Sequence, residues 1–513
     1  MPALTVLDMA MFALETKKRP FGVGPLIVLK PTPGKRRGFA DRLVARMLEQ
    51  PVKAPFDYRL KRGLGALPSV KSVDRVDPAA HIHRITLSGK ATMQELFDKV
   101  GELQAVLLDR SKPLWALYVI DGLQDGRVAL YGKVHHGIID GRGLINVLTQ
   151  WLSTDPRDRT VHALWEGLAR PVASNARASM AARLAAVWKG AGGLVGNTKG
   201  LAKLLAGRSV AMLGIADGLP LPFLRVPNVL DGRLDAKRTY SCCVLPLAEI
   251  KAFGKAHHAT VNDVFLTILD LALERYLKER GSVPKHPLVV DMPVALVGAA
   301  SGNQIAVMQF PLGQPGAAAP HRLKAVRENT TQLKRETNRQ SADAVMLYTA
   351  LAHGFPSLIE RIGMGRRIKL ANMVVSNPFG LPEPRYLMGA EVEMVLPMSL
   401  VAPGQTLNVT AVTLADKFQI GFLALPDAVP EVQKLAEYTV EAFDQLRDAM
   451  APSAAEGSAT PAAVHKNARA TGRKRSTTTR TAAPAGRRAG RKVAAKRAPR
   501  RSRTRRGGMR QRT

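Results

Sequence analysis

The sequence predicts a mixed α/β fold of more than one unit, followed by a disordered basic tail. Strand-like and helix-like apolar patterns alternate along the chain, most clearly in residues 128–152. With 513 residues and 46% hydrophobic content, the chain can bury sizeable cores in about two to four units. After Glu456, the last acidic residue, come 19 of the 75 Lys and Arg residues and almost no large apolar ones. Such a composition cannot support a core.

The clearest pattern is a strand followed by a helix. Two sets of residues alternate from Val128 to Val134, as in a buried strand. Beyond Gly141, apolar residues return at helical spacing, at Leu144, Ile145, Val147, Leu148, Trp151 and Leu152. The string His135-His136-Gly137-Ile138-Ile139-Asp140-Gly141 joins the two patterns. It therefore places two imidazoles at a strand-to-helix junction, where side chains are exposed.

Imidazoles in this position suit proton transfer. A free histidine has a pKa of roughly 6.5, and a positioned base adds about 10²–10⁴ in rate. Gly141 fits a tight bend, and Asp140 can hold the loop or orient an imidazole. By itself, a histidine pair is more often structural or merely exposed than catalytic. A metal site is disfavoured, because adjacent histidines do not readily face one ion and no cluster of Cys, Asp or Glu lies near them.

The complete string resembles the HHxxxDG motif of acyl-CoA-dependent acyltransferases. Flanking segments narrow the resemblance to the bacterial wax ester synthase/acyl-CoA:diacylglycerol acyltransferase family, over about residues 4–443. They are the opening segment Met9 to Thr16 with Val23 to Leu26, the PLW block Pro113-Leu114-Trp115, the ND block Asn262 to Leu266, and Ser376 to Gly380, which resembles an SNxPG block. In this last block Pro378 comes one position early and Phe379 stands where the family has proline.

This resemblance implies the fold and the chemistry of the site. The fold would be two halves like chloramphenicol acetyltransferase, with a tunnel between them. His136 would be the general base that takes the proton of an acceptor hydroxyl, whose oxygen attacks the acyl-CoA thioester directly. His135 would be supportive, and Asp140, with Gly141, would brace the loop rather than act on substrate. Acyl-CoA would be a co-substrate, with no further cofactor and no metal, and the residues that hold it are not indicated.

Asn262 and Asp263 have two interpretations of equal weight. The resemblance makes Asn262 a candidate polar wall of the site, with Asp263 beside it. Alternatively, Asn262 caps a helix, because an apolar run with helical spacing follows it and ends near Lys278 and Gly281.

The chain divides into four segments. Residues 1–165 form an N-terminal half with the HHxxxDG motif, 166–235 a basic crossover linker, 236–456 a C-terminal half, and 457–513 the tail. Within the linker, residues 168–216 contain no acidic residue, and their Lys and Arg are interspersed with Leu, Val and Trp. This segment either lies in a membrane interface or packs its apolar side on the two halves. The evidence for the two alternatives is equal.

The tail predicts binding to a polyanion. Its 19 positive charges, out of a net +34, would contact phosphates without reading bases, so nucleic acid and an anionic lipid surface fit equally well. The alternative is a solvated extension without a partner.

The C-terminal half is expected to end in a meander and a helix. Three period-2 sets indicate strands around Val392 to Leu396, Leu407 to Ala411 and Phe418 to Phe422. Pro430 suits the first position of a last helix, which would continue to Leu446.

Two further features bear on the compartment. No run of about 18 apolar residues is present, and the N-terminus lacks a signal-peptide pattern. The two cysteines, Cys242 and Cys243, are adjacent, which fits a reducing compartment and suggests no disulfide framework. We therefore expect a cytoplasmic protein that is peripheral on membranes or lipid inclusions.

Taken with the resemblance, the sequence predicts an O-acyltransferase that moves a long-chain acyl group from acyl-CoA to diacylglycerol or a long-chain alcohol. The product would be triacylglycerol or wax ester. A condensation or polyketide-ester type transferase of the same fold is the first alternative, although no carrier domain is evident. A non-catalytic lipid-inclusion protein or a nucleic-acid tether is the second, and an intact His136 argues against it.

Overall fold

The computed structural model describes most of the chain up to residue 451. The described residues are 4, 6–61, 68–139, 141–167, 202–203, 205–209, 219, 223, 226–295, 305–361, 369–378 and 380–451. The chain separates into a compact unit, Met1–Pro452, and a second unit, Ser453–Thr513. The predicted tail and most of the predicted linker therefore lie outside the described residues.

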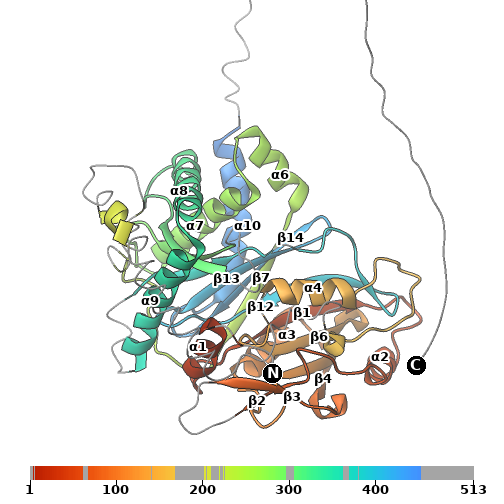
Figure 1. Ribbon diagram of the computed structural model, residues 1–513. Coiled ribbons are helices and arrows are strands. Elements are labelled where there is room, and N and C mark those ends of the chain that lie inside the picture. The colour runs from red at the N-terminus through yellow and green to blue at the C-terminus, as the bar shows by residue number, and fades with distance from the viewer. Residues whose placement is uncertain are drawn as a thin grey trace, which may run out of the picture. The chain divides into compact units, whose positions relative to one another are not determined.

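The first part of the compact unit alternates strands and helices, as the sequence predicts (Figure 1). Its elements are α1 (Val6–Leu14), β1 (Gly22–Lys30), α2 (Phe39–Leu48), β2 (Tyr58–Lys61), β3 (Ser69–Ser72), η1 (Pro78–His81), β4 (Ile82–Ala91), α3 (Met93–Ala105), β5 (Trp115–Leu123), η2 (Gln124–Gly126), β6 (Val128–His135), α4 (Gly141–Trp151) and η3 (Leu164–Glu166).

The second part contains longer helices. Its elements are β7 (Thr239–Pro246), α6 (Leu247–Ala256), α7 (Val261–Glu279), β8 (Val289–Ala295), β9 (Ile305–Pro311), α8 (Ala319–Arg339), α9 (Ala342–Arg361), β10 (Met373–Ser376), β11 (Tyr386–Leu387), β12 (Ala390–Met398), β13 (Leu407–Leu414), β14 (Lys417–Ala424) and α10 (Val432–Ala449).

The strands form two mixed six-stranded sheets, which confirms the α/β class and the two halves. The N-terminal sheet has the order β11-β12-β1-β6-β5-β4, and the C-terminal sheet the order β7-β14-β13-β10-β8-β9. In Figure 1 the helices α6, α7, α8 and α10 lie together above the strands of the C-terminal sheet. The apolar faces of α7 and α10 pack against that sheet and enclose the largest core.

One prediction about the strands is wrong. The three C-terminal strands do not form a meander, because β12 pairs with β1 of the N-terminal half while β13 and β14 form a hairpin in the other sheet. Since β11 and β12 complete the N-terminal sheet, the segment 236–456 is not a self-contained half. Because β1 lies between β12 and β6, its residues Gly22 to Leu29 are all buried.

The loop that leaves β12 ties the two halves together. This crossing loop, residues 399–406, accepts a hydrogen bond from Gln104 of α3 at Ser399 O (2.8 Å) and one from Arg19 at Val401 O (2.7 Å). At its far end, Gln405 donates to the buried Asp291 of β8. The halves also pack directly, because Phe97 of α3 meets Tyr240 of β7 edge-on, with ring centroids 5.3 Å apart.

The predicted linker is described only in places. Arg208 is buried, donates to Glu336 of α8 (3.2 Å, Nε to Oε2) and to the Tyr348 hydroxyl of α9 (3.1 Å). Leu205 packs on the C-terminal core. At these positions the linker packs on the protein rather than lying in a membrane interface.

The last helix begins later than predicted. Pro430 lies before the helix rather than at its first position, because Glu431 takes a left-handed conformation (φ 53°) and α10 starts at Val432. The Pro430 carbonyl instead accepts a hydrogen bond from Tyr276 of α7 (2.6 Å). Among the described residues, no helix is long and apolar enough to cross a membrane.

Removing the apolar side chain that seats β12 against β1 should destabilise the whole compact unit. Leu396 is fully buried opposite Leu26, so Leu396→Ala should lower the free energy of unfolding by about 2–5 kcal/mol in chemical denaturation. Leu351→Ala in α9 is the matched control, because Leu351 is 55% exposed and its loss should change stability by about 0.5 kcal/mol or less. If both variants lost the same free energy of unfolding, the packing of β12 against β1 would not stabilise the compact unit.

Candidate active site

The HHxxxDG string lies at the end of a central strand. β6 ends at His135 and α4 begins at Gly141, which confirms the predicted strand-to-helix junction. β6 is hydrogen-bonded to β1 on one side, where His135 faces Gly22, and to β5 on the other. The ladder extends to the motif itself, because the amide of His135 donates to Leu114 O and the amide of His136 donates to Phe21 O, each at 2.9 Å.

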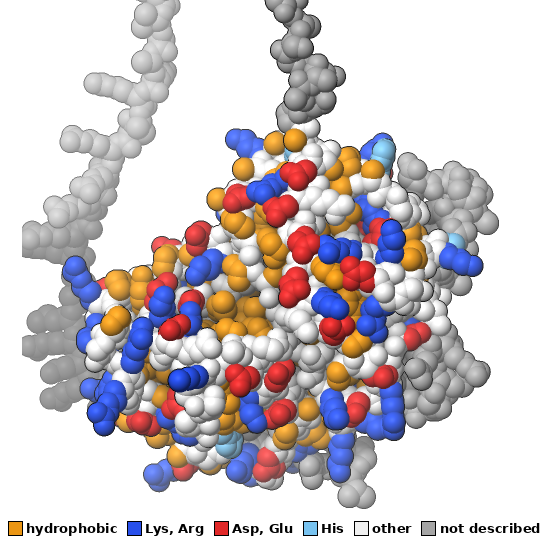
Figure 2. Space-filling view, turned by 180° about the vertical axis from the view of Figure 1, so that it is seen from behind, with side chains coloured by type: hydrophobic (Ala, Val, Ile, Leu, Met, Phe, Trp, Pro, Cys, Tyr) orange, Lys and Arg blue, Asp and Glu red, His pale blue; other side chains and the backbone are white. Residues whose placement is uncertain are grey.

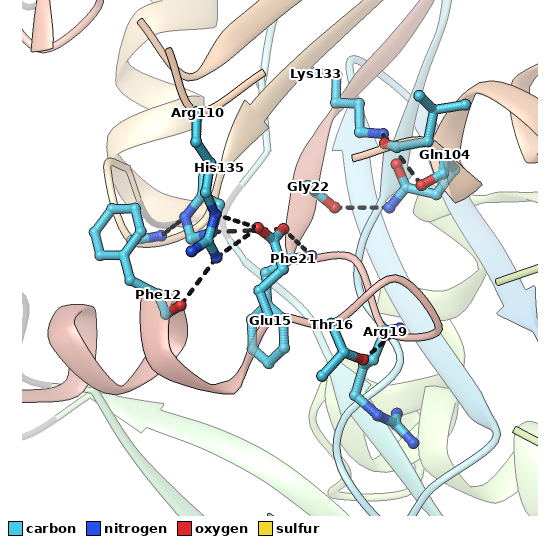
Figure 3. Close-up of polar contacts among 12 residues, drawn as sticks. Phe12, Glu15, Thr16, Arg19, Phe21, Gly22, Gln104, Arg110, Lys133 and His135 are labelled. Carbon is cyan, nitrogen blue, oxygen red and sulfur yellow. Dashed lines mark hydrogen bonds and ion pairs between the residues drawn. The ribbon is translucent and has the colours of Figure 1, made fainter. Parts of the chain in front are cut away.

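His135 is enclosed on all sides (Figure 3). Its side chain is completely buried, and its ring stacks on Phe12 of α1 with centroids 4.3 Å apart and planes 8° from parallel. The amide of Gly137 donates to Nδ1 (3.0 Å), so Nδ1 carries no proton. The remaining nitrogen, Nε2, lies 3.6 Å from Oε1 of Glu15 and holds the ring proton. His135 is thus fixed in one tautomer and cannot reach a substrate.

Glu15 is the centre of this arrangement. In Figure 3 its carboxylate lies among His135, Arg110 and the backbone of Phe21, and it accepts hydrogen bonds from Arg110 Nη2 (2.9 Å) and the Phe21 amide (3.0 Å). Arg110 also donates to Phe12 O (2.9 Å). Burial raises the pKa of Glu15, but the contacts with His135, Phe21 and Arg110 outweigh burial and lower that pKa to about 2. The residue is an anion throughout the physiological range.

His136 is placed differently from its neighbour. Its amide bonds to Phe21, the residue before β1. His136 follows the last residue of β6 and lies in the turn that the Ile138 amide closes by donating to His135 O (2.8 Å). It differs from the fully buried His135 in being only partly buried.

The turn after His136 depends on a glycine that the sequence analysis did not single out. A Cβ on Gly137 would lie 2.8 Å from the Phe12 ring and 3.1 Å from the carbonyl oxygen of Asp8, so α1 can pack on the turn only if this residue is glycine. Gly141, by contrast, is the first residue of α4, and a Cβ there would meet no atom within 4 Å. Asp140 lies outside the described residues.

The buried Lys133 ties β6 to the end of α3. Lys133 of β6 donates to Leu103 O (2.8 Å), Gln104 O (3.1 Å) and Val106 O, at the C-terminal end of α3, where the helix dipole favours a cation. From that helix end, the Gln104 side chain donates to Gly22 O (2.6 Å), and it accepts from Tyr131. Burial lowers the pKa of Lys133 to about 7, while the charge of Glu15 opposes that shift.

The PLW block supports the other side of the strand. Trp115 begins β5, donates from its indole to Phe56 O (2.8 Å), and stacks on His81 with ring centroids 4.3 Å apart. Leu114, which precedes it, supplies the carbonyl that receives the His135 amide. This block therefore positions the end of β6.

The ND block lies in the C-terminal half and has a structural part. Thr260, not Asn262, is the N-cap of α7, so the interpretation of Asn262 as the cap is wrong. Asp263 completes a capping box with Thr260 and also accepts from Thr330 of α8 (2.7 Å), which ties the two helices together. Asn262 is partly buried, and its amide lies 3.9 Å from the sulfur of Met292 on β8. The contacts given for Asn262 and Asp263 are therefore with the C-terminal half and not with the His135–Gly141 loop.

The fourth block is only partly described. Ser376 ends β10, and Phe379 lies outside the described residues. Gly380 allows a close approach, because a Cβ there would lie 2.1 Å from Thr413 O. Leu381 then continues the contact by donating its amide to the same carbonyl (2.8 Å).

Comparison with protein families identifies the arrangement. Residues 4–265 match the wax ester synthase/diacylglycerol acyltransferase catalytic domain, and residues 301–447 match the WS/DGAT C-terminal domain. The chain belongs to this family. A Mycobacterium tuberculosis relative named "Probable diacyglycerol O-acyltransferase Tgs4" is 32% identical over 462 residues, which cover 87% of this chain and 97% of the relative.

Solved structures agree on the fold. The wax ester synthase/diacylglycerol acyltransferase from Marinobacter aquaeolei VT8 superposes with a TM-score of 0.64 at 24% identity, over 88% of this chain and 100% of that one. The first condensation domain of the calcium-dependent antibiotic synthetase superposes with a TM-score of 0.52 at 18% identity, over 88% and 97%. The two halves are therefore those of the WS/DGAT and condensation-domain fold, and the tunnel between them stays a prediction.

Replacing Glu15 should weaken the fold in a pH-dependent way. A carboxyl group whose pKa falls from 4.5 to about 2 stabilises the folded state above pH 4.5, and this contribution disappears as the pH falls towards 2. Glu15→Gln should therefore lower the free energy of unfolding by about 3 kcal/mol at pH 7. In urea unfolding, the difference from the wild-type protein should begin to shrink below about pH 4.5. Glu49→Gln, a change at an exposed glutamate, is the control, and a similar loss there would refute the role of Glu15.

Proposed function

We propose that this WS/DGAT family member transfers a long-chain acyl group from acyl-CoA to the hydroxyl of diacylglycerol or a long-chain alcohol. The observation that carries the proposal is the division of labour in the histidine pair. His135 is buried between Glu15 and the Gly137 amide, while its neighbour His136 is partly exposed. We infer that the first imidazole shapes the loop and that the second carries the chemistry.

In the proposed reaction His136 acts as the general base. Its imidazole takes the proton of the acceptor hydroxyl while the oxygen attacks the thioester carbonyl of acyl-CoA. The tetrahedral intermediate then collapses, the carbon–sulfur bond breaks, and the imidazolium returns the proton to the thiolate. The products are an ester and free CoA. No acyl-enzyme forms, because the acceptor oxygen attacks directly.

The other motif residues have supporting roles in this proposal. His135 holds the turn through its contact with the Gly137 amide. Asp140 braces the loop, and Gly141 starts α4 directly after it. Asn262 lines a polar wall of the site, and Asp263 fixes the start of α7 on which Asn262 lies.

Diacylglycerol is the favoured acceptor. The support is the name of the Mycobacterium tuberculosis relative, which specifies diacylglycerol O-acyltransferase activity. A long-chain alcohol presents the same hydroxyl on an apolar body and is the second acceptor. The enzyme would meet either one at a membrane or lipid-inclusion surface in the cytoplasm. The basic tail would add affinity for an anionic surface or for nucleic acid.

Loss of the proposed base should abolish acyl transfer. His136→Ala should lower the turnover rate by at least about 10², because the hydroxyl loses its proton acceptor. The measurement is thiol release from palmitoyl-CoA with diacylglycerol as acceptor, together with a melting curve to show that the variant is folded. Turnover within about tenfold of the wild-type rate would refute the assignment.

The identity of the acceptor has its own test. Purified protein with palmitoyl-CoA should release thiol faster with diacylglycerol than with hexadecanol when both are presented in the same mixed micelles. A reversed preference would make the protein chiefly a wax ester synthase. Thiol release that requires neither acceptor would indicate thioester hydrolysis and would contradict the proposed transfer.

A further inference from the structure

A second cationic feature lies at the opposite end of the N-terminal sheet from the histidines. A depression encloses about 440 Å³ of empty space, open mouth included, and its lining includes Lys35, Phe39, Arg42, Arg159, Gly389 and Ala390. It lies between the start of α2 and the β11–β12 turn. Gly22 of β1 pairs with His135, and Lys30 follows eight residues later. At about 3.3 Å per residue, the depression is roughly 26 Å from the catalytic strand end.

The floor and the rim of the depression differ in chemistry. The floor is apolar, because Pro31, Phe39, Met388 and Ala390 line it. The rim is cationic, with Lys35, Arg42 and Arg159 all exposed, and no acidic residue is among the lining residues. An apolar floor beneath a cationic rim suits the phosphate end of an amphiphile.

The rim is built rather than accidental. Arg42 donates to Lys35 O (2.8 Å) and Arg37 O (2.7 Å), which fixes the loop before α2 around its guanidinium. Arg159 donates to Met388 O (3.1 Å). A Cβ on Gly389 would overlap the Arg159 guanidinium, so glycine at that position allows the arginine to lie over the turn.

More cations extend the rim into a surface. We call Lys35, Arg36, Arg37, Arg42 and Arg159 the α2 surface. Lys35, Arg36 and Arg37 are exposed, and within the described part of the chain none of these three forms an ion pair. In Figure 2 several Lys and Arg side chains gather at lower left, where the α2 end of the N-terminal half lies.

The one nearby helix carboxylate does not neutralise this surface. Asp41 of α2 is directed to Arg84 of β4 (3.1 Å), which also pairs with Asp121 (2.6 Å), and it forms no ion pair with a described residue of the α2 surface. From Lys30 to Arg46, six residues are basic and one is acidic. Clusters of four to eight Lys and Arg residues beside an apolar element are typical of sites that bind anionic phospholipids.

We propose that the α2 surface docks the protein on an anionic phospholipid bilayer, with a lipid phosphate seated among Lys35, Arg42 and Arg159. A nucleic acid would satisfy the same charges. We favour a bilayer because apolar residues, among them the partly exposed Met388, line the depression between the cations, and such a lining suits the glycerol end of a lipid headgroup.

The test compares two full-length variants that lose the same charge. The first is Lys35→Gln/Arg36→Gln/Arg37→Gln. The matched control is Lys251→Gln/Lys255→Gln/Lys278→Gln on α6 and α7, which also removes three exposed positive charges and leaves the tail intact. Each protein is co-sedimented with phosphatidylcholine vesicles with and without phosphatidylglycerol. Acyl transfer to a short soluble alcohol should be unchanged in both variants, which shows that they are folded.

The α2 variant should bind phosphatidylglycerol vesicles at least about tenfold more weakly than the wild-type protein, because each basic residue near an anionic surface strengthens binding about fivefold. The control should bind within about threefold of wild type. Equal losses in both variants would reduce the effect to net charge, and no loss in either would assign binding to another part of the chain. Both results would overturn the proposal, as would a loss of DNA binding with vesicle binding unchanged.

A second pair of variants tests the phosphate position. Arg159 lines the depression and Arg157, two residues away, does not. Arg159→Gln should weaken vesicle binding more than Arg157→Gln, and equal effects would refute the seated phosphate.

Competition with free glycerol phosphate distinguishes a phospholipid headgroup from a soluble phosphate ester as the source of the bound phosphate. If millimolar glycerol phosphate releases the protein from vesicles completely at constant ionic strength, the depression is a site for a soluble phosphate ester and the membrane proposal is wrong. Since vesicle binding is measured separately from acyl transfer, the docking proposal can fail while the proposed acyl transfer holds.

Discussion

The end of the N-terminal sheet that carries the HHxxxDG motif depends on one buried carboxylate. Glu15 joins α1, the loop before β1, Arg110 and the last residue of β6 in a single set of contacts. A buried anion is costly unless it is paired and hydrogen-bonded, and here each requirement is met by a different element. Because these elements share the carboxylate, none of them can shift alone. The position of His136, one residue beyond the shared contact, is set in the same way.

The connection between the halves also helps to fix the end of β6, through contacts over a longer range. β12 completes the N-terminal sheet beside β1, and its crossing loop is held by Arg19 and Gln104 on one side and by Asp291 on the other. Gln104 also binds the carbonyl of Gly22, the residue that pairs with His135. A movement of the C-terminal half would therefore reach β6 through the two hydrogen bonds of the Gln104 side chain.

Much of the fold was predictable because the relevant patterns are local. The strand ending at His135, the helix after Gly141 and the helix over the ND block all follow from residue spacing. The pairing of β12 with β1 was not predictable, since period-2 sets show that strands exist but not which strands meet. The cap at Thr260 was missed because Asn262 is an equally good capping residue type, and only the backbone geometry separates the two.

The site was predictable in its motif and not in its surroundings. Glu15 lies in the opening segment that resembles the family, but nothing in one sequence shows that it meets a histidine 120 positions later. Gly137 is part of the motif, but the sequence does not show that a side chain at this position would collide with Phe12. The basic tail is evident in the sequence because its charges lie in one segment. The α2 surface gathers Arg159 with residues 35–42 only through the fold.

The central claim is that His135 is a fixed structural imidazole and that its partly exposed neighbour His136 is the proposed base. The most direct measurement is a ¹H–¹⁵N correlation spectrum of the histidine side chains, with His135 assigned from the spectrum of His135→Gln. The account predicts that His135 is a neutral ring protonated at Nε2 and not at Nδ1, and that this state persists when acyl-CoA is added. A proton on Nδ1 of His135, or a signal that responds to substrate as a base would, contradicts it.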